Sequence, residues 1–320
     1  MDLPRELSAA IEEAAASFQL KELQESAEKI RSVYLEEKSD GISIVSKEAE
    51  AMAYALTRMP ACYAAVRKSL DLTLEFTEDV PRTLLDIGAG TGAVLWAADS
   101  LIALKKAKLL ERESSMSSLG KKLAKYGEEV VSEASWASFD LVNGEIGETA
   151  ELVTASYILN ELREEDFLPS AKKLYDAAEK ILLIVEPGTP KAFAKMRKLR
   201  EYFISIGGKI VAPCPHMESC PMPEEDWCHF TARISRSSLQ KKLKEAEAPF
   251  EDEKFTFLAV AKKESSRAEA RIIRHPQIRS GHIILSLCKK EGPVQLTLTK
   301  KDGQAYKLAR KAEAGDSFDE

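Results

Sequence analysis

Three of the chain's five cysteines lie in one short loop, residues 212–230, which reads APCPHMESCPMPEEDWCHF. The loop places Cys214, Cys220 and Cys228 among four prolines. Thiolates are ligands that select zinc or iron–sulfur clusters. Thiols crowded this closely would also oxidise or pair unless a metal held them. The sequence therefore predicts a metal site in this loop.

The identity of the metal and of the fourth ligand depends on spacing. Zinc ribbons and knuckles use C-x2-4-C pairs, whereas five and seven residues separate these cysteines, a wide spacing that favours the larger cage of a [4Fe-4S] cluster. Cys288 is the candidate fourth thiolate, because Cys62 lies on an apolar helical pattern and is predicted to be buried in the core. His216 or His229 would instead complete a zinc site.

A second motif, LLDIGAGTGA, follows a predicted strand and opens a predicted helix. Its glycines, Gly88, Gly90 and Gly92, allow the backbone to approach a ligand closely. Their spacing is G-x-G-x-G and differs from the dinucleotide-binding G-x-G-x-x-G. The motif resembles motif I of the class I S-adenosylmethionine (SAM)-dependent methyltransferases.

That resemblance implies further contacts to the cofactor. Asp86, at the end of the first strand, is expected to order the loop and to receive the methionine amino group through a water or backbone contact. Glu111 ends the second strand, where a carboxylate accepts both ribose hydroxyls. Asp140, near the end of the third strand, is expected to contact the adenine.

Catalytic residues are not identified by the sequence. Adenine N6 methyltransferases have an Asn/Asp-Pro-Pro-aromatic turn after the fourth strand, and here the turn reads Asn160-Glu161-Leu162. Asn160 and Glu161 either line the cofactor pocket or cap the next helix. No general base or nucleophile emerges.

The remaining pattern predicts an α/β fold, a Rossmann-like class I methyltransferase with additions. Residues 1–80 follow a helical period, with a break or new helix start at Pro60. Residues 81–263 alternate apolar strands (TLLDIG, AKLLE, ELVTASYIL, KILLIVE) with helices, which predicts a largely parallel sheet and includes the cysteine loop. Residues 264–320 contain the strand-like runs HIILSLC and VQLTLT and are predicted to form a small basic β segment with a frayed end, AEAGDSFDE.

Charge is distributed unevenly along the chain. The net charge is −6, yet residues 1–80 carry nine Lys/Arg against sixteen Asp/Glu, and residues 264–311 carry eleven Lys/Arg against four Asp/Glu. A basic end attracts polyanions locally even on an acidic protein, although an ordinary solvated surface explains the charges equally well.

Composition also bears on location. No run of about 18 apolar residues is present, which argues against a membrane-spanning helix. The N-terminal residues are acidic and lack an apolar signal core or an Arg-rich transit pattern. With an odd number of cysteines, these features predict a reducing cytoplasm.

Three segments together, SYILNEL, LLIVEPGTP and PCPHMESCPMPEEDWCHF, carry a family resemblance that covers most of the chain. The chain resembles the methyltransferase-like ribosomal small-subunit assembly factors, the Rsm-type proteins. The resemblance implies SAM binding, docking on small-subunit rRNA, and a [4Fe-4S] cluster on Cys214, Cys220, Cys228 and Cys288. We expect a monomer.

The basic residues fit an rRNA partner. A basic patch on the tail is expected to grip rRNA phosphates, and the helix before the cysteine loop extends it. The patch comprises Lys289, Lys290, Lys300, Lys301, Arg310 and Lys311, extended by Arg197, Lys198 and Arg200. Two alternatives are an active SAM-dependent rRNA methyltransferase and a small-molecule methyltransferase with a structural zinc site.

Overall fold

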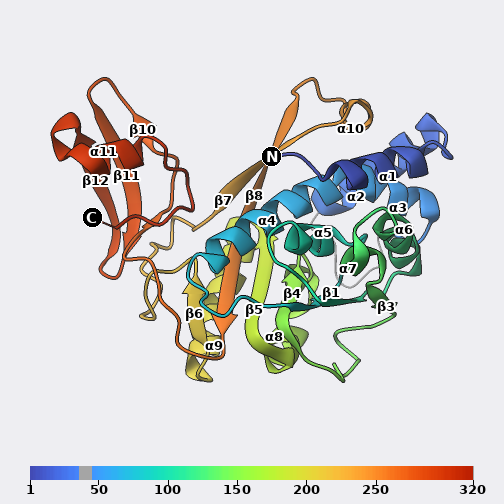
Figure 1. Ribbon diagram of the computed structural model, residues 1–320, viewed down its shortest axis with the longest axis horizontal. Helices are drawn as coiled ribbons and strands as arrows, with labels where there is room; N and C mark the ends of the chain where they lie inside the picture. The colour runs from blue at the N-terminus through green and yellow to red at the C-terminus, as the bar shows by residue number, and fades with distance from the viewer. Residues whose placement is uncertain (36–44, 320) are drawn as a thin grey trace.

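The computed structural model describes residues 1–35 and 45–319, and its centre is an eight-stranded sheet (Figure 1). The strand order is β3-β2-β1-β4-β5-β8-β6, and β7 pairs with β8. The strands are β1 (Thr83–Ile87), β2 (Lys106–Leu110), β3 (Ser135–Ala137), β4 (Ala150–Ser156), β5 (Ala178–Pro187), β6 (Lys209–Ala212), β7 (Phe230–Ser235) and β8 (Phe250–Ala261).

Strands β1 to β5 are parallel, and β8 runs antiparallel to β5, β6 and β7. This arrangement confirms the predicted Rossmann-like α/β fold. The chain leaves β1 towards β2 on one side, and β4 lies on the other side of β1. The carboxyl ends of β1 and β4 therefore form a topological switch point, the place where open α/β sheets bind ligands.

Helices cover both faces of the sheet, because alternate strand residues point to opposite sides. Leu84, Leu152 and Leu183 face one hydrophobic cluster, which they share with the N-terminal helices and α5–α7. Leu85 and Val153 face the other cluster, beneath α8 and α9. The helices are α1 (Arg5–Ala15), α2 (Leu20–Leu35), α3 (Glu48–Thr57), α4 (Met59–Leu74), α5 (Ala93–Asp99), α6 (Ser114–Ala124), α7 (Glu129–Ser132), η1 (Leu159–Glu161), α8 (Glu164–Ala177), α9 (Pro190–Ser205) and α10 (Ser238–Leu243).

The predicted helix boundary at Pro60 is confirmed. Helix α3 ends at Thr57, and α4 begins at Met59 with Pro60 in its first turn, where a missing N–H costs little. Cys62 on α4 is 5% exposed, which confirms the prediction of a core cysteine. None of the helices in the described residues has the length and apolar character needed to cross a membrane.

The end of the chain forms a second sheet, the C-terminal sheet, which lies apart from the main sheet in Figure 1. Ile283, Leu285 and Leu287 of its central strand are fully buried against Ala309 and Phe318. Its elements are β9 (Arg271–Ile272), β10 (Gln277–Ile278), β11 (His282–Lys289), β12 (Gly292–Thr299), η2 (Lys300–Asp302) and α11 (Gly303–Ala309).

The last residues were predicted to fray, and this prediction is wrong. Ala314 and Phe318 are 4% exposed, and Ser317 forms a β-bridge with Arg271. The C-terminal segment is ordered because its apolar side chains, Ala314 and Phe318, pack against the C-terminal sheet despite their acidic neighbours. The domain boundaries predicted after residues 80 and 263 stay predictions.

Candidate cofactor pocket and cysteine site

The glycine loop connects β1 to α5 at the switch point, and two of its glycines have conformations that exclude other residues. Gly88 has φ +71°, and a Cβ there would lie 2.5 Å from Cγ2 of Ile158. Gly92 caps α5 with φ +90°. The loop is anchored to the next strand, because the Gly88 N–H donates to the Leu110 carbonyl at 2.8 Å. Gly88 and Gly90 line an open pocket, and Gly92 does not.

Glu111 follows β2 and faces the same pocket. One carboxylate oxygen accepts the Gly90 N–H and the other accepts the Glu113 N–H, both at 2.7 Å. Burial raises the pKa of Glu111, and these two N–H donors oppose the rise. The carboxylate thus fixes the glycine loop, and each oxygen keeps a lone pair for a ribose hydroxyl.

Of the other predicted cofactor residues, one lines the pocket and two do not. Asp140 lines the pocket but also caps its own turn, accepting the Val142 N–H at 2.9 Å. Asp86 is fully buried beneath the loop, accepts from the Thr154 hydroxyl at 2.7 Å, and does not line the pocket. Burial raises the pKa of Asp86 to about 7. Asn160 also turns away, with its Oδ1 buried and unpaired within the described residues.

The loop after β4 brings Glu161 to the pocket instead of Asn160. Glu186 at the end of β5 accepts the Leu159 N–H at 2.8 Å, and Lys195 on α9 donates to the Asn160 carbonyl at 2.9 Å. These contacts hold both ends of η1. Burial raises the pKa of Glu161 to about 7, so it exchanges a proton near neutrality.

Two tyrosines that the sequence analysis missed complete the pocket wall. Tyr54 reaches it from α3, and Tyr157 follows β4 with φ +61°, a left-handed conformation that is costly for an aromatic residue. The Tyr157 hydroxyl donates to Glu253 at 3.0 Å, and Glu253 also binds Arg58 at 3.2 Å. Backbone strain of this kind concentrates at functional sites. The predicted strand ELVTASYIL included Tyr157, whereas β4 ends at Ser156, so nothing in the sequence marked this position.

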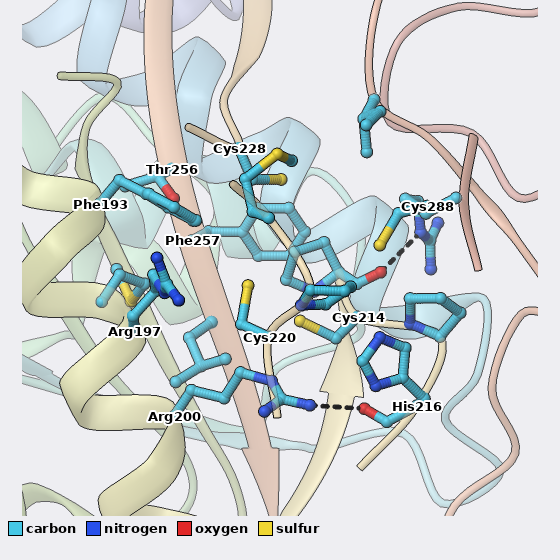
Figure 2. A pocket seen from close by; sticks show the side chains of 18 residues that line it. Phe193, Arg197, Arg200, Cys214, His216, Cys220, Cys228, Thr256, Phe257 and Cys288 are labelled. Atoms are coloured by element: carbon cyan, nitrogen blue, oxygen red, sulfur yellow. Dashed lines mark hydrogen bonds between the residues drawn. The ribbon is translucent and has the colours of Figure 1, made fainter. Parts of the chain in front are cut away.

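The four predicted cysteine ligands line one pocket (Figure 2). Cys214 follows β6, Cys220 and Cys228 lie in the loop before β7, and Cys288 lies on β11 of the C-terminal sheet. Burial raises the pKa of Cys288 to about 12 and holds that of Cys228 well above its ordinary value. A thiolate at these positions therefore needs a compensating positive charge.

The two histidines differ. His216 lines the pocket, and both of its ring nitrogens are buried and unpaired within the described residues. His229 does not line the pocket; it stacks on Trp227 with ring centroids 5.1 Å apart. Within residues 1–35 and 45–319, no three His, Cys, Asp or Glu side chains form a group that could hold a single metal ion.

The predicted basic patch needs one correction. Arg200 is 2% exposed and lines the cysteine pocket, so it cannot reach rRNA phosphates. It shares a buried face of α9 with Phe193, Met196 and Phe203, at helical spacing. Among the tail residues, Lys290, Lys300, Lys301, Arg310 and Lys311 are exposed and Lys289 is half-buried.

The sequence matches one protein family and several known mitochondrial proteins. A family model described as "Mitochondrial small ribosomal subunit Rsm22" matches residues 48–319. The human ribosome assembly protein METTL17, mitochondrial, is 26% identical over 302 residues, covering 87% of this chain and 62% of that protein. The Rsm22-cox11 tandem protein 2, mitochondrial, of Schizosaccharomyces pombe is 25% identical over 215 residues, covering 52% of this chain and 29% of that protein. The chain thus spans less than two thirds of these relatives.

Solved structures that match this chain include methyltransferases. Magnesium protoporphyrin IX methyltransferase from Synechocystis PCC 6803, with bound SAM, is 13% identical with a TM-score of 0.41, covering 71% of this chain and 88% of that chain. The N-methyltransferase NodS from Bradyrhizobium japonicum WM9, in complex with S-adenosyl-L-homocysteine (SAH), is 11% identical with a TM-score of 0.43. The match covers 66% of this chain and 92% of that chain.

The sequence relatives contradict the predicted cytoplasmic location, because the family and both curated relatives are mitochondrial by description. That prediction used the charge of the first residues and the cysteine count, and neither feature identifies a compartment. The predicted family is confirmed. Since the family model matches residues 48–319, the chain belongs to the Rsm22 family of mitochondrial small-ribosomal-subunit proteins.

Proposed function

We propose that this chain is an rRNA-binding assembly factor of the small ribosomal subunit, with a SAM-binding pocket and a structural [4Fe-4S] cluster on Cys214, Cys220, Cys228 and Cys288. One observation carries the proposal: in a member of the Rsm22 family, four thiols from two distant segments face a single pocket. The assembly role in the name of the human relative supports the ribosomal part.

The donor set fits a cluster better than a single zinc ion. Tetrahedral zinc with Zn–S bonds near 2.3 Å requires sulfurs about 3.8 Å apart. The described side chains include no group gathered for one ion, although four thiols border the same space. The larger cage of a cluster suits that wider arrangement. When bound, the cluster supplies a rigid cross-link between the cysteine loop and β11.

Anaerobically purified protein is expected to be brown and to contain about four iron atoms and four acid-labile sulfides per chain. Burial raises the pKa of Cys228 and Cys288, so these two thiols lose their protons only when a metal cation binds. Iron, sulfide and zinc analysis on one preparation checks this. Colourless protein with stoichiometric zinc would contradict the cluster.

Support for the SAM pocket comes from its position and its wall. The pocket opens at the carboxyl ends of β1 and β4, beside the glycine loop. Glu111 stands where a carboxylate would accept both ribose hydroxyls, and Asp140 stands further along the wall. Tyr54 and Tyr157 add aromatic surface on the side of the N-terminal helices.

The exposed part of the basic patch is expected to make rRNA binding strongly dependent on salt. If about six phosphates are contacted, affinity should fall on the order of 10³-fold between 50 and 200 mM salt. Filter binding to a small-subunit rRNA fragment measures this dependence. Replacing Lys300 and Lys301 by Gln should flatten the slope by roughly 1.4–1.8, whereas a wild-type response independent of salt would refute phosphate contacts.

Glu161 favours a second candidate, an active SAM-dependent rRNA methyltransferase. It lines the pocket with a pKa of about 7, so its carboxylate can accept a proton from an acceptor base. In that case labelled methyl groups enter immature small subunits, the rate rises through pH 7 as Glu161 deprotonates, and Glu161→Gln lowers it about 10²- to 10⁴-fold without loss of SAM binding. Absence of labelled product with SAM bound would leave the assembly factor without methyl transfer.

A further inference from the structure

Two arginines are buried beside the four thiols. Arg200 on α9 is 2% exposed and Arg271 on β9 is 1% exposed, and both line the cysteine pocket. Figure 2 shows Arg200 extending below Cys214 and Cys220. A buried charge is strongly unfavourable unless it is paired and hydrogen-bonded. Neutral thiols do not provide that compensation.

Arg200 lacks a counter-charge within the described residues. Its Nη2 donates to the His216 carbonyl at 2.9 Å, while Nε and Nη1 are buried without a partner. No carboxylate of the described chain lies within salt-bridge distance of it. The planar guanidinium of Arg200 has five N–H donors, of which only part form hydrogen bonds. The unused donors lie in the pocket that the four cysteines line.

Arg271 is partly compensated. Its Nε donates to the Pro213 carbonyl at 2.9 Å and its Nη1 to the Gly315 carbonyl at 2.8 Å. Nη1 also lies 3.6 Å from Glu75, a residue whose side chain is 40% exposed and therefore well solvated. Nη2 is buried and unpaired within the described residues.

The other cations near the pocket are paired or reached by solvent. Arg274 forms a 2.5 Å ion pair with Asp226. Arg197 also lines the pocket, but it is half-buried, so water screens its charge. The pocket therefore holds two fully buried guanidinium charges, and these point to an anionic occupant.

We infer that Arg200 and Arg271 are positioning residues that neutralise a doubly anionic, four-thiolate occupant of the cysteine pocket. The inference rests on the proposed function. Four thiolates around a [4Fe-4S]²⁺ core carry two net negative charges, matching two guanidinium groups. The same core held by three thiolates and a neutral His216 would carry only one net negative charge. One of the two arginines would then remain uncompensated. His216 is therefore assigned to the wall and not to the ligands.

The pKa values of the thiols are consistent with this role of the two arginines. Burial raises the pKa of Cys214, and Arg200 opposes that rise. At Cys288, both arginines oppose the rise that burial causes. Charged donors near cluster sulfurs also raise the reduction potential, because they stabilise the added electron.

The test compares Arg200→Met in loaded and metal-free protein, after anaerobic reconstitution with iron and sulfide. Loaded Arg200→Met should release iron to a chelator on the order of tenfold faster than wild type, and its reduction potential should be lower. The metal-free variant should unfold close to the wild-type temperature, because the substitution removes an uncompensated charge. Arg200→Lys should recover part of the iron retention.

Lys198→Met is the matched control, with the same charge change on the same helix but an exposed side chain that pairs with Glu164 outside the pocket, and it should keep iron as long as wild type. Equal loss of stability in loaded and metal-free Arg200→Met would show that Arg200 acts only through its bond to His216 and would overturn the inference. If Arg200→Met does not fold, Arg271→Met replaces it with the same expectations. Wild-type protein that takes up no metal overturns the proposed function itself, whereas normal loading with unchanged iron release from the variant overturns this inference alone.

Discussion

Replacing Cys288 with serine is expected to lower the iron content of anaerobically purified protein from about four atoms per chain to below one. Serine is a poor ligand for iron–sulfur clusters, and Cys288 is the proposed ligand that lies on β11. The other three thiols lie in the loop between β6 and β7. Three thiols on one loop retain a cluster less tightly than four thiols on two segments. Iron and sulfide analysis of the variant measures the effect.

The same substitution should loosen the C-terminal sheet. Without the cluster, a small apolar group around Phe193, Met222 and Ile273 joins that sheet to the cysteine loop. Arg274 adds an ion pair to Asp226 at 2.5 Å. These contacts hold the sheet in place but do not cross-link it, so hydrogen exchange in β11 and β12 should accelerate while exchange in β1 and β4 stays slow.

Cys62→Ser is the control for this experiment. Cys62 is also buried, but it lies on α4 and contacts the Tyr54 hydroxyl at 3.7 Å, outside the cysteine pocket. Its substitution should cost roughly 1–3 kcal/mol of stability and leave iron unchanged. Unchanged iron in Cys288→Ser would instead move the fourth ligand to His216 and remove the proposed link to the C-terminal sheet.

The parallel strands were predictable because they are continuous apolar runs bounded by polar residues. Strand β7 was missed because its six residues, FTARIS, directly follow the cysteine loop. Its alternation is clear in hindsight, since Phe230, Ala232 and Ile234 are buried and Arg233 is exposed. Helix α11 was missed because its seven residues have little amphipathic pattern; packing on β11 and β12 supplies what local propensity does not.

Within the sites, sequence spacing singled out Glu111 and the three loop cysteines, which line pockets in the structure, because each belongs to a local motif. It did not reveal that Glu161, rather than Asn160, faces the pocket, since adjacent residues of a short 3₁₀ turn point in different directions. Arg200 was assigned to the rRNA surface from its basic neighbours. Its helical phase with Phe193, Met196 and Phe203 was the signal for burial.

Glu111→Ala is expected to weaken SAM binding on the order of 100-fold. After the loss of iron in Cys288→Ser, this is the second large effect that we expect. The carboxylate would accept two ribose hydroxyls, each a charge-assisted hydrogen bond of about 1.5–3 kcal/mol. It also holds the Gly90 N–H at 2.7 Å, so its removal frees the glycine loop that shapes the pocket. Calorimetric titration with SAM and with SAH measures the loss, and both ligands should lose affinity because both carry the ribose.

Glu113→Ala separates the ribose contact from a general change in charge. Glu113 lines the same pocket and bears the same charge, but its side chain lies 3.1 Å from Arg112 Nε, and it is its backbone N–H that reaches Glu111. The Glu113→Ala substitution should therefore change SAM affinity by less than about fivefold. The proposed cluster site lies in a separate pocket, so iron content should stay constant in both variants. If Glu111→Ala binds SAM as tightly as wild type, Glu111 does not hold the ribose, and the proposed placement of the nucleoside at this switch point is wrong.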